Sequence, residues 1–210
     1  MTDQSTAVQT EPSDVRGRLL AAALQLFTTK GYAATTVREI VEAAGVTKPV
    51  LYYYFHNKEG IYLELVQEPY ARFGTILTEC LTASGSAGER LLALCDRVMQ
   101  LFVDELDVAR LMYAIYYGPS QGAPFFDFEA HHQTLHDIMA ALVQAGIENG
   151  ELRGENPEEM AWVILGALNV ALEEQLCQHA PRLSGQGLQK VLNLILRSFA
   201  PAGAGKEVSR

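Results

Sequence analysis

The sequence predicts an all-α protein, and two observations support that prediction. Apolar residues recur at spacings of three and four through most of the 210 residues, and no segment alternates apolar and polar residues as a half-buried strand does. Residues that start and stop helices lie between the apolar stripes. We expect short helices over residues 13–60, a larger helical bundle over 61–200, a disordered arm at 1–12 and a disordered tail at 201–210.

The first predicted helix spans about residues 13–30 and ends at Gly31. A second helix begins where Thr36 and Glu39 form a capping box, in which each side chain satisfies an unpaired amide of the first turn. Gly45 follows only two or three turns later, so this helix is short.

A third short helix follows at once, because Thr47 can cap it and Pro49 is tolerated in its first turn. Two short helices joined by a turn of three or four residues with a glycine form a helix-turn-helix unit, and here a longer helix precedes it. The predicted core of this unit consists of Val37, Ile40, Val41, Ala44, Val46, Leu51 and Phe55.

The remaining helices are longer. Asn57 can cap a fourth helix that starts at Lys58, and Pro69 should kink or break it because proline lacks an amide and crowds the preceding turn. Ser86 and Glu89 form a second capping box. We expect the later helices at about 87–104, 107–117, from the loop around residue 126 to 149, 157–179 and 184–199.

The charge is distributed unevenly along the chain. The net charge is −9, but residues 15–60 hold six cations against three anions and so carry +3, which leaves −12 for the remainder. Nucleic-acid binding requires local positive charge, which displaces the counterions condensed on phosphates. The distribution therefore favours a nucleic-acid-binding segment in an otherwise acidic chain.

The third predicted helix carries side chains suited to DNA, within the stretch GVTKPVLYYYFHNKE at residues 45–59. When such a helix enters a major groove N-terminus first, its first two turns meet base edges and its flanks meet phosphates. Lys48 can donate to guanine O6 or N7, and Pro49 and Val50 can contact a thymine methyl group. Thr47 can donate to a phosphate or a base.

Other residues around this helix can reach the DNA backbone. Tyr53 and Tyr54 carry hydroxyls on rigid rings, and Lys58 can add a charge-assisted phosphate contact at the start of the next helix. Arg38 on the second helix can reach a phosphate or a guanine edge. Tyr52 can either face the groove or support the helix, and the sequence leaves both roles open.

Residues 35–65, TTVREIVEAAGVTKPVLYYYFHNKEGIYLEL, resemble the N-terminal domain of the TetR family of transcriptional regulators. The resemblance covers about residues 15–65 and rests on LF-x3-GY at 26–32, T-x3-I at 36–40, AGV at 44–46 and LYYYF-x-NKE at 51–59. It implies that the second and third helices bind a double-stranded operator, and that a larger helical C-terminal domain dimerises and binds an effector. It also implies DNA contacts by Thr36, Arg38, Thr47, Lys48, Pro49, Val50, Tyr52, Tyr53, Tyr54 and Lys58.

The C-terminal part of the sequence indicates where an effector could bind. A helical bundle can hold a small molecule in an apolar interior with a few polar groups. Aromatic side chains gather around the loop near residue 120, and Asn169 and Glu173 lie four apart beside an apolar stripe. For any single one of these residues, ordinary core packing is the favoured explanation. The candidate effector-binding residues are Met112, Tyr113, Tyr116, Tyr117, Phe125, Phe126, Trp162, Asn169 and Glu173.

His132 and His136 have the spacing at which two imidazoles can share a metal ion, but the sequence identifies no third ligand. We therefore prefer structural roles for both and expect no metal site. No nucleophile, phosphate-binding or paired-carboxylate pattern predicts catalysis. We expect neither an enzyme nor a cofactor.

The last two predicted helices carry apolar stripes with small residues, Gly166, Ala167 and Ala171, which permit close helix approach. We expect them to form a four-helix homodimer interface, as the resemblance also implies. A dimer suits DNA binding because two third helices can then occupy successive major grooves of a pseudo-palindrome.

The leading hypothesis is a ligand-responsive repressor, which leaves its operator when a small, largely apolar effector binds. The sequence shows no secretory pattern and no apolar run of about 18 residues, so we expect a cytoplasmic protein without a membrane segment. Two alternatives stay open: a DNA-binding structural protein without an effector, and a helical protein or enzyme that binds small molecules. Activation instead of repression also stays open.

Overall fold

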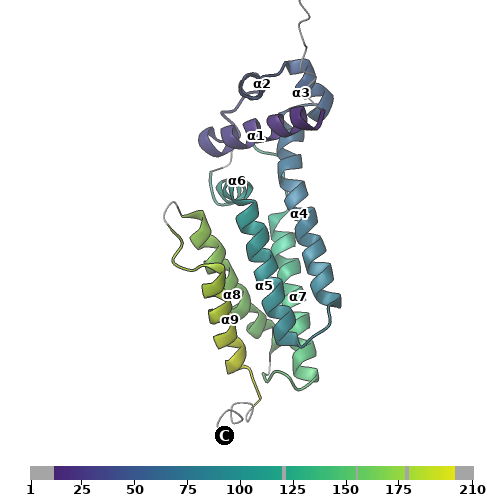
Figure 1. Cartoon of the computed structure of the whole chain (residues 1–210), viewed down its shortest axis with the longest axis vertical. Coiled ribbons are helices and arrows are strands. Elements are labelled where there is room, and N and C mark those ends of the chain that lie inside the picture. The colour runs from purple at the N-terminus through teal and green to yellow at the C-terminus, as the bar shows by residue number, and fades with distance from the viewer. Residues whose placement is uncertain (1–11, 120–121, 155, 178–179, 202–210) are drawn as a thin grey trace, which may run out of the picture. The chain divides into compact units, whose positions relative to one another are not determined.

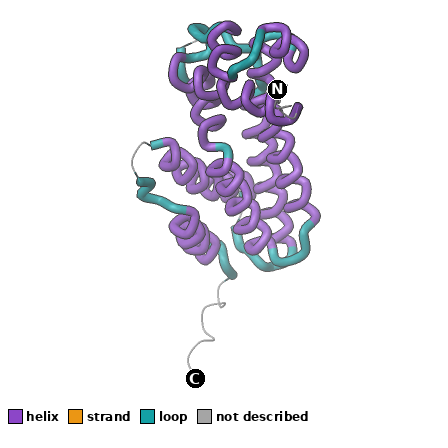
Figure 2. Tube along the Cα trace, turned by 45° about the horizontal axis from the view of Figure 1, so that its top comes forward, coloured by secondary structure: helices purple, strands orange, loops and turns teal. Residues whose placement is uncertain are grey.

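The computed structural model describes residues 12–119, 122–154, 156–177 and 180–201. In these ranges the regular secondary structure is helical, and Figure 2 shows helices joined by loops with no strand among them. The all-α prediction is confirmed. The arm and the tail expected at the two ends lie outside the described residues, apart from Pro12 and Pro201.

The helices of the described residues follow the chain in the order labelled in Figure 1. Their ends agree closely with the prediction because the capping residues are local signals, and the reciprocal capping boxes of Thr36 with Glu39 and of Ser86 with Glu89 are both present. The helices are α1 Pro12–Lys30, α2 Val37–Ala44, α3 Lys48–Phe55, α4 Lys58–Thr82, α5 Ala87–Asp104, α6 Leu106–Tyr116, α7 Phe128–Glu148, α8 Pro157–Leu176 and α9 Gly185–Ser198.

The chain divides into two compact units. The first comprises the residues up to Glu68 together with Arg110–Phe126, and the second comprises Pro69–Ala109 together with the residues from Asp127 onward. The first unit therefore extends beyond residue 60, where the sequence analysis placed the end of the N-terminal domain.

Pro69 lies inside α4 and does not end it, so of the two expected effects, a kink or a break, the break does not occur. An interior proline costs about 3 kcal/mol, because it removes one hydrogen bond and crowds the carbonyl four residues earlier. On the N-terminal side of Pro69 the helix buries Ile61 and Val66, and on the C-terminal side it buries Leu77. Burial of an aliphatic side chain contributes about 1.5–3 kcal/mol, so these residues together offset the loss.

In the first unit, α2 packs against α1 and α3. Leu51 and Phe55 of α3 are buried, as predicted, and so are Ile40, Val41 and Ala44 of α2. Val37 and Val46, which were expected in the same core, are only partly buried, because Val37 is the first residue of α2 and Val46 lies in the turn between α2 and α3. The core fixes which face of α3 points inward and leaves the opposite face to solvent.

In the second unit, α5 packs against α7, α8 and α9, which lie around it in Figure 1. The apolar stripe predicted for α5 supplies Leu91, Leu94 and Val98 to one continuous core. Gly146 lies where α7 approaches the start of α5, and a Cβ atom there would stand 2.6 Å from the Cβ of Ala87. Only glycine permits this close approach. In the described part of the chain, no helix is both long enough and apolar enough to cross a membrane.

Candidate nucleic-acid interface

Hydrogen bonds fix both ends of α2. The Thr36 hydroxyl accepts from the Glu39 amide at 3.3 Å, and the Glu39 carboxylate accepts from the Thr36 amide at 2.9 Å. At the other end Gly45 adopts a left-handed conformation with φ 64°, which suits glycine because it has no side chain to clash. Arg18 of α1 donates to the carbonyl of Ala44 at 3.0 Å. The orientation of α2 relative to α1 is therefore held by directed contacts as well as by its core.

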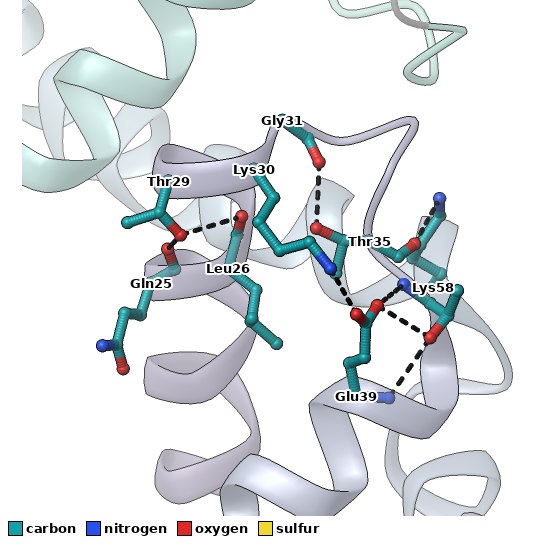
Figure 3. A network of polar contacts seen from close by, with 9 residues as sticks. Gln25, Leu26, Thr29, Lys30, Gly31, Thr35, Glu39 and Lys58 are labelled. Carbon is teal, nitrogen blue, oxygen red and sulfur yellow. Dashed lines mark hydrogen bonds and ion pairs between the residues drawn. The ribbon is translucent and has the colours of Figure 1, made fainter.

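Glu39 also pairs with Lys30 at the end of α1, as Figure 3 shows. The hydrogen bond from Lys30, followed by those from the amide and hydroxyl of Thr36, lowers the pKa of Glu39 to about 2. The Thr36 hydroxyl, predicted to contact DNA, donates to this carboxylate at 2.9 Å. Thr36 thus has a capping role in the structure, and its DNA contact stays a prediction.

Arg38 lies on the exposed face of α2, where its Nε donates to the Glu42 carboxylate at 2.7 Å. The hydrogen bond and the charge of Glu42 raise the pKa of Arg38. The pair leaves the guanidinium on the surface of α2. The sequence analysis missed this pair, although opposite charges four residues apart on a helix are a local signal for it.

The first turn of α3 presents polar and small apolar side chains to solvent. Thr47 occupies the N-cap position, but its side chain makes no capping hydrogen bond, contrary to the expected cap. Lys48 and Pro49 are exposed and Val50 is partly buried. Backbone bonds close the turn, since the amides of Val50 and Leu51 both donate to the carbonyl of Thr47. The Thr47 hydroxyl is therefore not used to hold the helix.

The three consecutive tyrosines occupy different environments. Tyr53 is 79% exposed, Tyr52 is 48% exposed and Tyr54 is partly buried. The ring of Tyr54 packs edge-on against that of Tyr53, with 5.0 Å between centroids, and tilts against Phe55 at 6.2 Å. Tyr54 thus holds Tyr53 in place from the side, and the surface position of Tyr52 leaves it able to face a groove.

The junction between α3 and α4 is tight. His56 has a φ of 64°, and the Asn57 amide donates across it to the Phe55 carbonyl at 2.7 Å, which closes a γ-turn. The Asn57 side chain accepts from the Gly60 amide at 2.8 Å and so caps α4, as predicted. A Cβ atom on Gly60 would stand 2.0 Å from the Phe55 carbonyl oxygen, so this position requires glycine.

Lys58, predicted to contact a phosphate, points its ammonium toward the loop between α1 and α2. The Nζ atom donates to the carbonyls of Tyr32 at 2.8 Å and Thr35 at 2.9 Å, and it lies 4.1 Å from the centroid of the Tyr32 ring. Figure 3 shows Lys58 beside Thr35 at this loop. Burial lowers the pKa of Lys58. These contacts join residues 23 and 26 positions apart, for which the sequence offers no local signal.

The predicted DNA contacts all lie in the first unit, on α2, on α3 and its cap, and at the start of α4. Most of the charges around them are paired internally, as in Arg16 with Glu64 and Lys30 with Glu39. Lys48 takes part in none of the ion pairs described above and is exposed on α3. The surface therefore offers one exposed lysine at the end of the helix that would enter a groove.

The candidate effector residues fall into two groups. Met112, Tyr113, Tyr116, Tyr117, Phe125 and Phe126 belong to the first unit, and Trp162, Asn169 and Glu173 lie on α8 in the second. Among them the Tyr117 ring contacts both Tyr113 at 5.5 Å and Tyr116 at 4.8 Å. Their grouping into one effector site stays a prediction.

The histidines of α7 contact α8. His136 is buried and its ring lies tilted against that of Trp162 with 4.3 Å between centroids, and His132 Nε2 lies 3.3 Å from Asn169 Nδ2. Asn169 therefore has a protein partner in the structure. Among the described residues, no three His, Cys, Asp or Glu side chains come together in a group that could hold a metal ion.

Comparison with known proteins gives matches to part of the chain and to nearly all of it. Residues 19–65 match the family model of bacterial regulatory proteins of the tetR family. The repressor AcnR of Corynebacterium glutamicum is 25% identical over 191 residues, which cover 91% of this chain and 95% of AcnR. The transcriptional activator FasR of Mycolicibacterium smegmatis is 32% identical over 98 residues, which cover 47% of this chain and 45% of FasR.

Two solved structures share the fold. The TetR family regulator PfmR from Thermus thermophilus has a TM-score of 0.67 at 22% identity, covering 86% of this chain and 97% of PfmR. The complex of SmeT with triclosan has a TM-score of 0.68 at 20% identity, covering 90% and 93% of the two chains. The matched N-terminal helices, the relative that matches along nearly its whole length and the shared helical fold all support a TetR family transcriptional regulator.

Proposed function

We propose that the protein is a repressor that binds a pseudo-palindromic operator as a homodimer and releases it when a small, largely apolar effector binds. AcnR, which matches along nearly its whole length, is named a repressor, whereas FasR, which matches along about half, is named an activator. The full-length match favours repression. Operator binding would place the protein in the cytoplasm, and the proposal contains no catalytic step.

The observation that carries the proposal is the first turn of α3. Lys48 and Pro49 are exposed there, and the Thr47 hydroxyl makes no capping bond, while Leu51 and Phe55 anchor the opposite face in the core. A helix held in this way can enter a major groove without rearranging. The charged and polar side chains of its first turn would then meet the base edges.

Each exposed residue has a distinct role in the proposal. Lys48 donates to guanine O6 or N7, and Pro49 and Val50 contact a thymine methyl group. Tyr53, the most exposed of the three tyrosines, reaches a phosphate oxygen, and Arg38 reaches a guanine edge or a phosphate with its terminal nitrogens. Further contacts from α2 and α3 are assigned to Thr36, Thr47, Tyr52 and Tyr54.

Selection of bound sequences from a pool of random double-stranded DNA tests the proposal. We expect one enriched sequence with two inverted half-sites about one helical turn or slightly more apart. Tyr53→Ala should weaken binding to the selected and to unrelated DNA alike, because a phosphate contact carries no sequence information. Arg153→Ala, which removes an exposed charge from the second unit, is the control. Enrichment of no sequence by the wild-type protein would refute the proposal.

The proposed dimer interface lies on α8 and α9. One side of α8 is buried in the second unit through residues such as Ile164 and Leu168, yet Trp162, Val163 and Val170 on the other side are about half exposed. On α9, Leu194 is 70% exposed. A helix that is apolar all round is normally covered on all sides, so a second copy of α8 and α9 is the proposed cover.

The proposed effector is small and apolar because the candidate residues are mostly aromatic. SmeT has a solved structure in complex with triclosan, but its likeness to this chain extends only to the fold. An effector must bind the DNA-releasing conformation more tightly than the DNA-binding one, since equal affinity would shift nothing. A compound that raises the melting temperature and also weakens operator binding would meet both conditions.

A further inference from the structure

The ammonium of Lys58 already has partners within the protein. Its ammonium donates to two backbone carbonyls, those of Tyr32 and Thr35, and it covers the face of the Tyr32 ring at 4.1 Å. Hydrogen bonds from a charged donor are stronger than those between neutral groups, and a cation over an aromatic face is attracted to the ring. To reach a phosphate the ammonium would have to give up these three partners.

The loop that receives Lys58 leads directly into α2. Thr35 is buried, its hydroxyl donates to the Gly31 carbonyl at 2.9 Å, and its amide donates to the Tyr32 carbonyl at 3.3 Å. Thr36, the next residue, is the N-cap of α2. The position of the Thr35 carbonyl therefore fixes where α2 begins and in which direction it runs.

The Tyr32 ring links the same loop to two helices. It packs against Phe27 of α1 and Tyr62 of α4, with 5.2 Å between centroids in both pairs. These rings are buried, so they attach the loop to the core of the unit. Lys58 adds a directed polar contact from the first residue of α4 to both ends of the same turn.

We propose that Lys58 is a positioning residue for DNA binding: its ammonium ties the start of α4 to the α1–α2 loop and so sets the direction in which α2 presents Arg38 to the operator. The proposal rests on the proposed function, because it concerns how the DNA-contacting helices are held. It differs from the phosphate contact that the family resemblance implies for this lysine.

Lys58→Met tests the proposal, because methionine keeps a long unbranched side chain but cannot donate. In the DNA-free protein, amide hydrogen exchange over residues 32–38 should become faster by about tenfold or more, as expected for the loss of charge-assisted hydrogen bonds. Binding to the selected operator should weaken by a similar factor. The slope of log affinity against log salt should stay that of the wild type, because no phosphate contact is removed.

Lys48→Met is the matched control, since it removes one exposed ammonium from the same helix-turn-helix. Lys48→Met should leave the exchange of residues 32–38 unchanged and weaken operator binding. Lys58→Arg, which can donate to the same carbonyls and cover the same ring, should restore both the exchange rate and the affinity. A purely structural role would show faster exchange with operator affinity unchanged, and that result overturns the proposal.

A phosphate-contact role gives the opposite pattern. Lys58→Met would then lower the salt slope by about 0.9 and leave the DNA-free protein with wild-type exchange, and this too overturns the proposal. If the wild-type protein selects no DNA, the proposed function fails, while the exchange data still report whether Lys58 holds the loop.

A measurement on the wild-type protein covers the case in which Lys58→Met does not fold. The ¹H–¹⁵N resonance of the Lys58 ammonium should be shifted by the Tyr32 ring and should keep its position when the operator is added. Movement of this resonance on DNA binding, with contacts to ³¹P, would show that the ammonium leaves the loop and would overturn the proposal.

Discussion

The tight junction between α3 and α4 makes Gly60→Ala the most informative single change in the first unit. Gly60 lies in the first turn of α4, and a Cβ atom there would stand 2.0 Å from the Phe55 carbonyl oxygen and 3.1 Å from its carbon. These are backbone atoms, and the oxygen already accepts from the Asn57 amide at 2.7 Å. No side-chain rotation can relieve the clash, so the junction itself must open.

The magnitude follows from two opposing effects. Alanine is better than glycine in a helix by about 1 kcal/mol, whereas forcing atoms into a well-packed site costs about 1–3 kcal/mol. Because ordinary contact requires about 3.4 Å, the junction must open by more than about 1 Å, which places the cost near the upper end of the range. We expect Gly60→Ala to destabilise the first unit by about 1–2 kcal/mol.

Amide hydrogen exchange over α2 and α3 measures this loss locally, and about 1–2 kcal/mol corresponds to exchange that is about 5–30 times faster. Gly17→Ala is the matched control, because it lies inside α1 of the same unit and its added Cβ would meet nothing within 4 Å. It should slow exchange or leave it unchanged. Exchange in Gly60→Ala as slow as in Gly17→Ala would refute the packing argument for the junction.

Three further predictions concern pH, core packing and assembly. The pKa of Glu39 is lowered to about 2, so its contribution to stability is complete above its ordinary pKa of 4.5 and is lost as the pH falls toward 2. In an acid titration followed by circular dichroism, Glu39→Gln should therefore lose less stability over that pH range than the wild type does. Gly146→Ala places a Cβ atom 2.6 Å from that of Ala87, so it should lower the urea midpoint of unfolding, followed by Trp162 fluorescence, by an amount equivalent to about 1–3 kcal/mol. Gly166→Ala is the control, because its added Cβ would meet nothing within 4 Å in the single chain, and no clash of that kind should lower its midpoint. Leu194→Glu places a charge on the proposed dimer face and should yield monomers in sedimentation velocity with the helical content retained, and a dimer of unchanged affinity would exclude Leu194 from the interface.

Much of the fold follows from local signals in the sequence. The capping boxes at Thr36 and Ser86 and the glycine at the end of α2 each act within a few residues, so the helix ends agree with the structure. The spacing of Leu51 and Phe55 likewise determines which face of α3 is buried. The buried face of α3 could therefore be predicted from the sequence.

Features that depend on distant contacts could not be predicted in this way. α4 continues through Pro69 because residues on both sides of it are buried. The local preferences of proline do not take such packing into account. Lys58 turns toward Tyr32 and Thr35, more than twenty residues earlier in the chain. The side-chain partner of Asn169 is likewise set by the packing of α7 on α8, for which the sequence gives no local signal.

The central claim is that the exposed first turn of α3 determines operator specificity. The most direct test is a binding titration of the wild-type protein and of Lys48→Ala with the selected operator and with unrelated DNA of equal length. We expect Lys48→Ala to weaken operator binding by about 1–3 kcal/mol, or roughly 5- to 150-fold, and to affect unrelated DNA much less, so that the ratio of the two affinities falls. Equal weakening on both DNAs, or no change on either, would contradict the account.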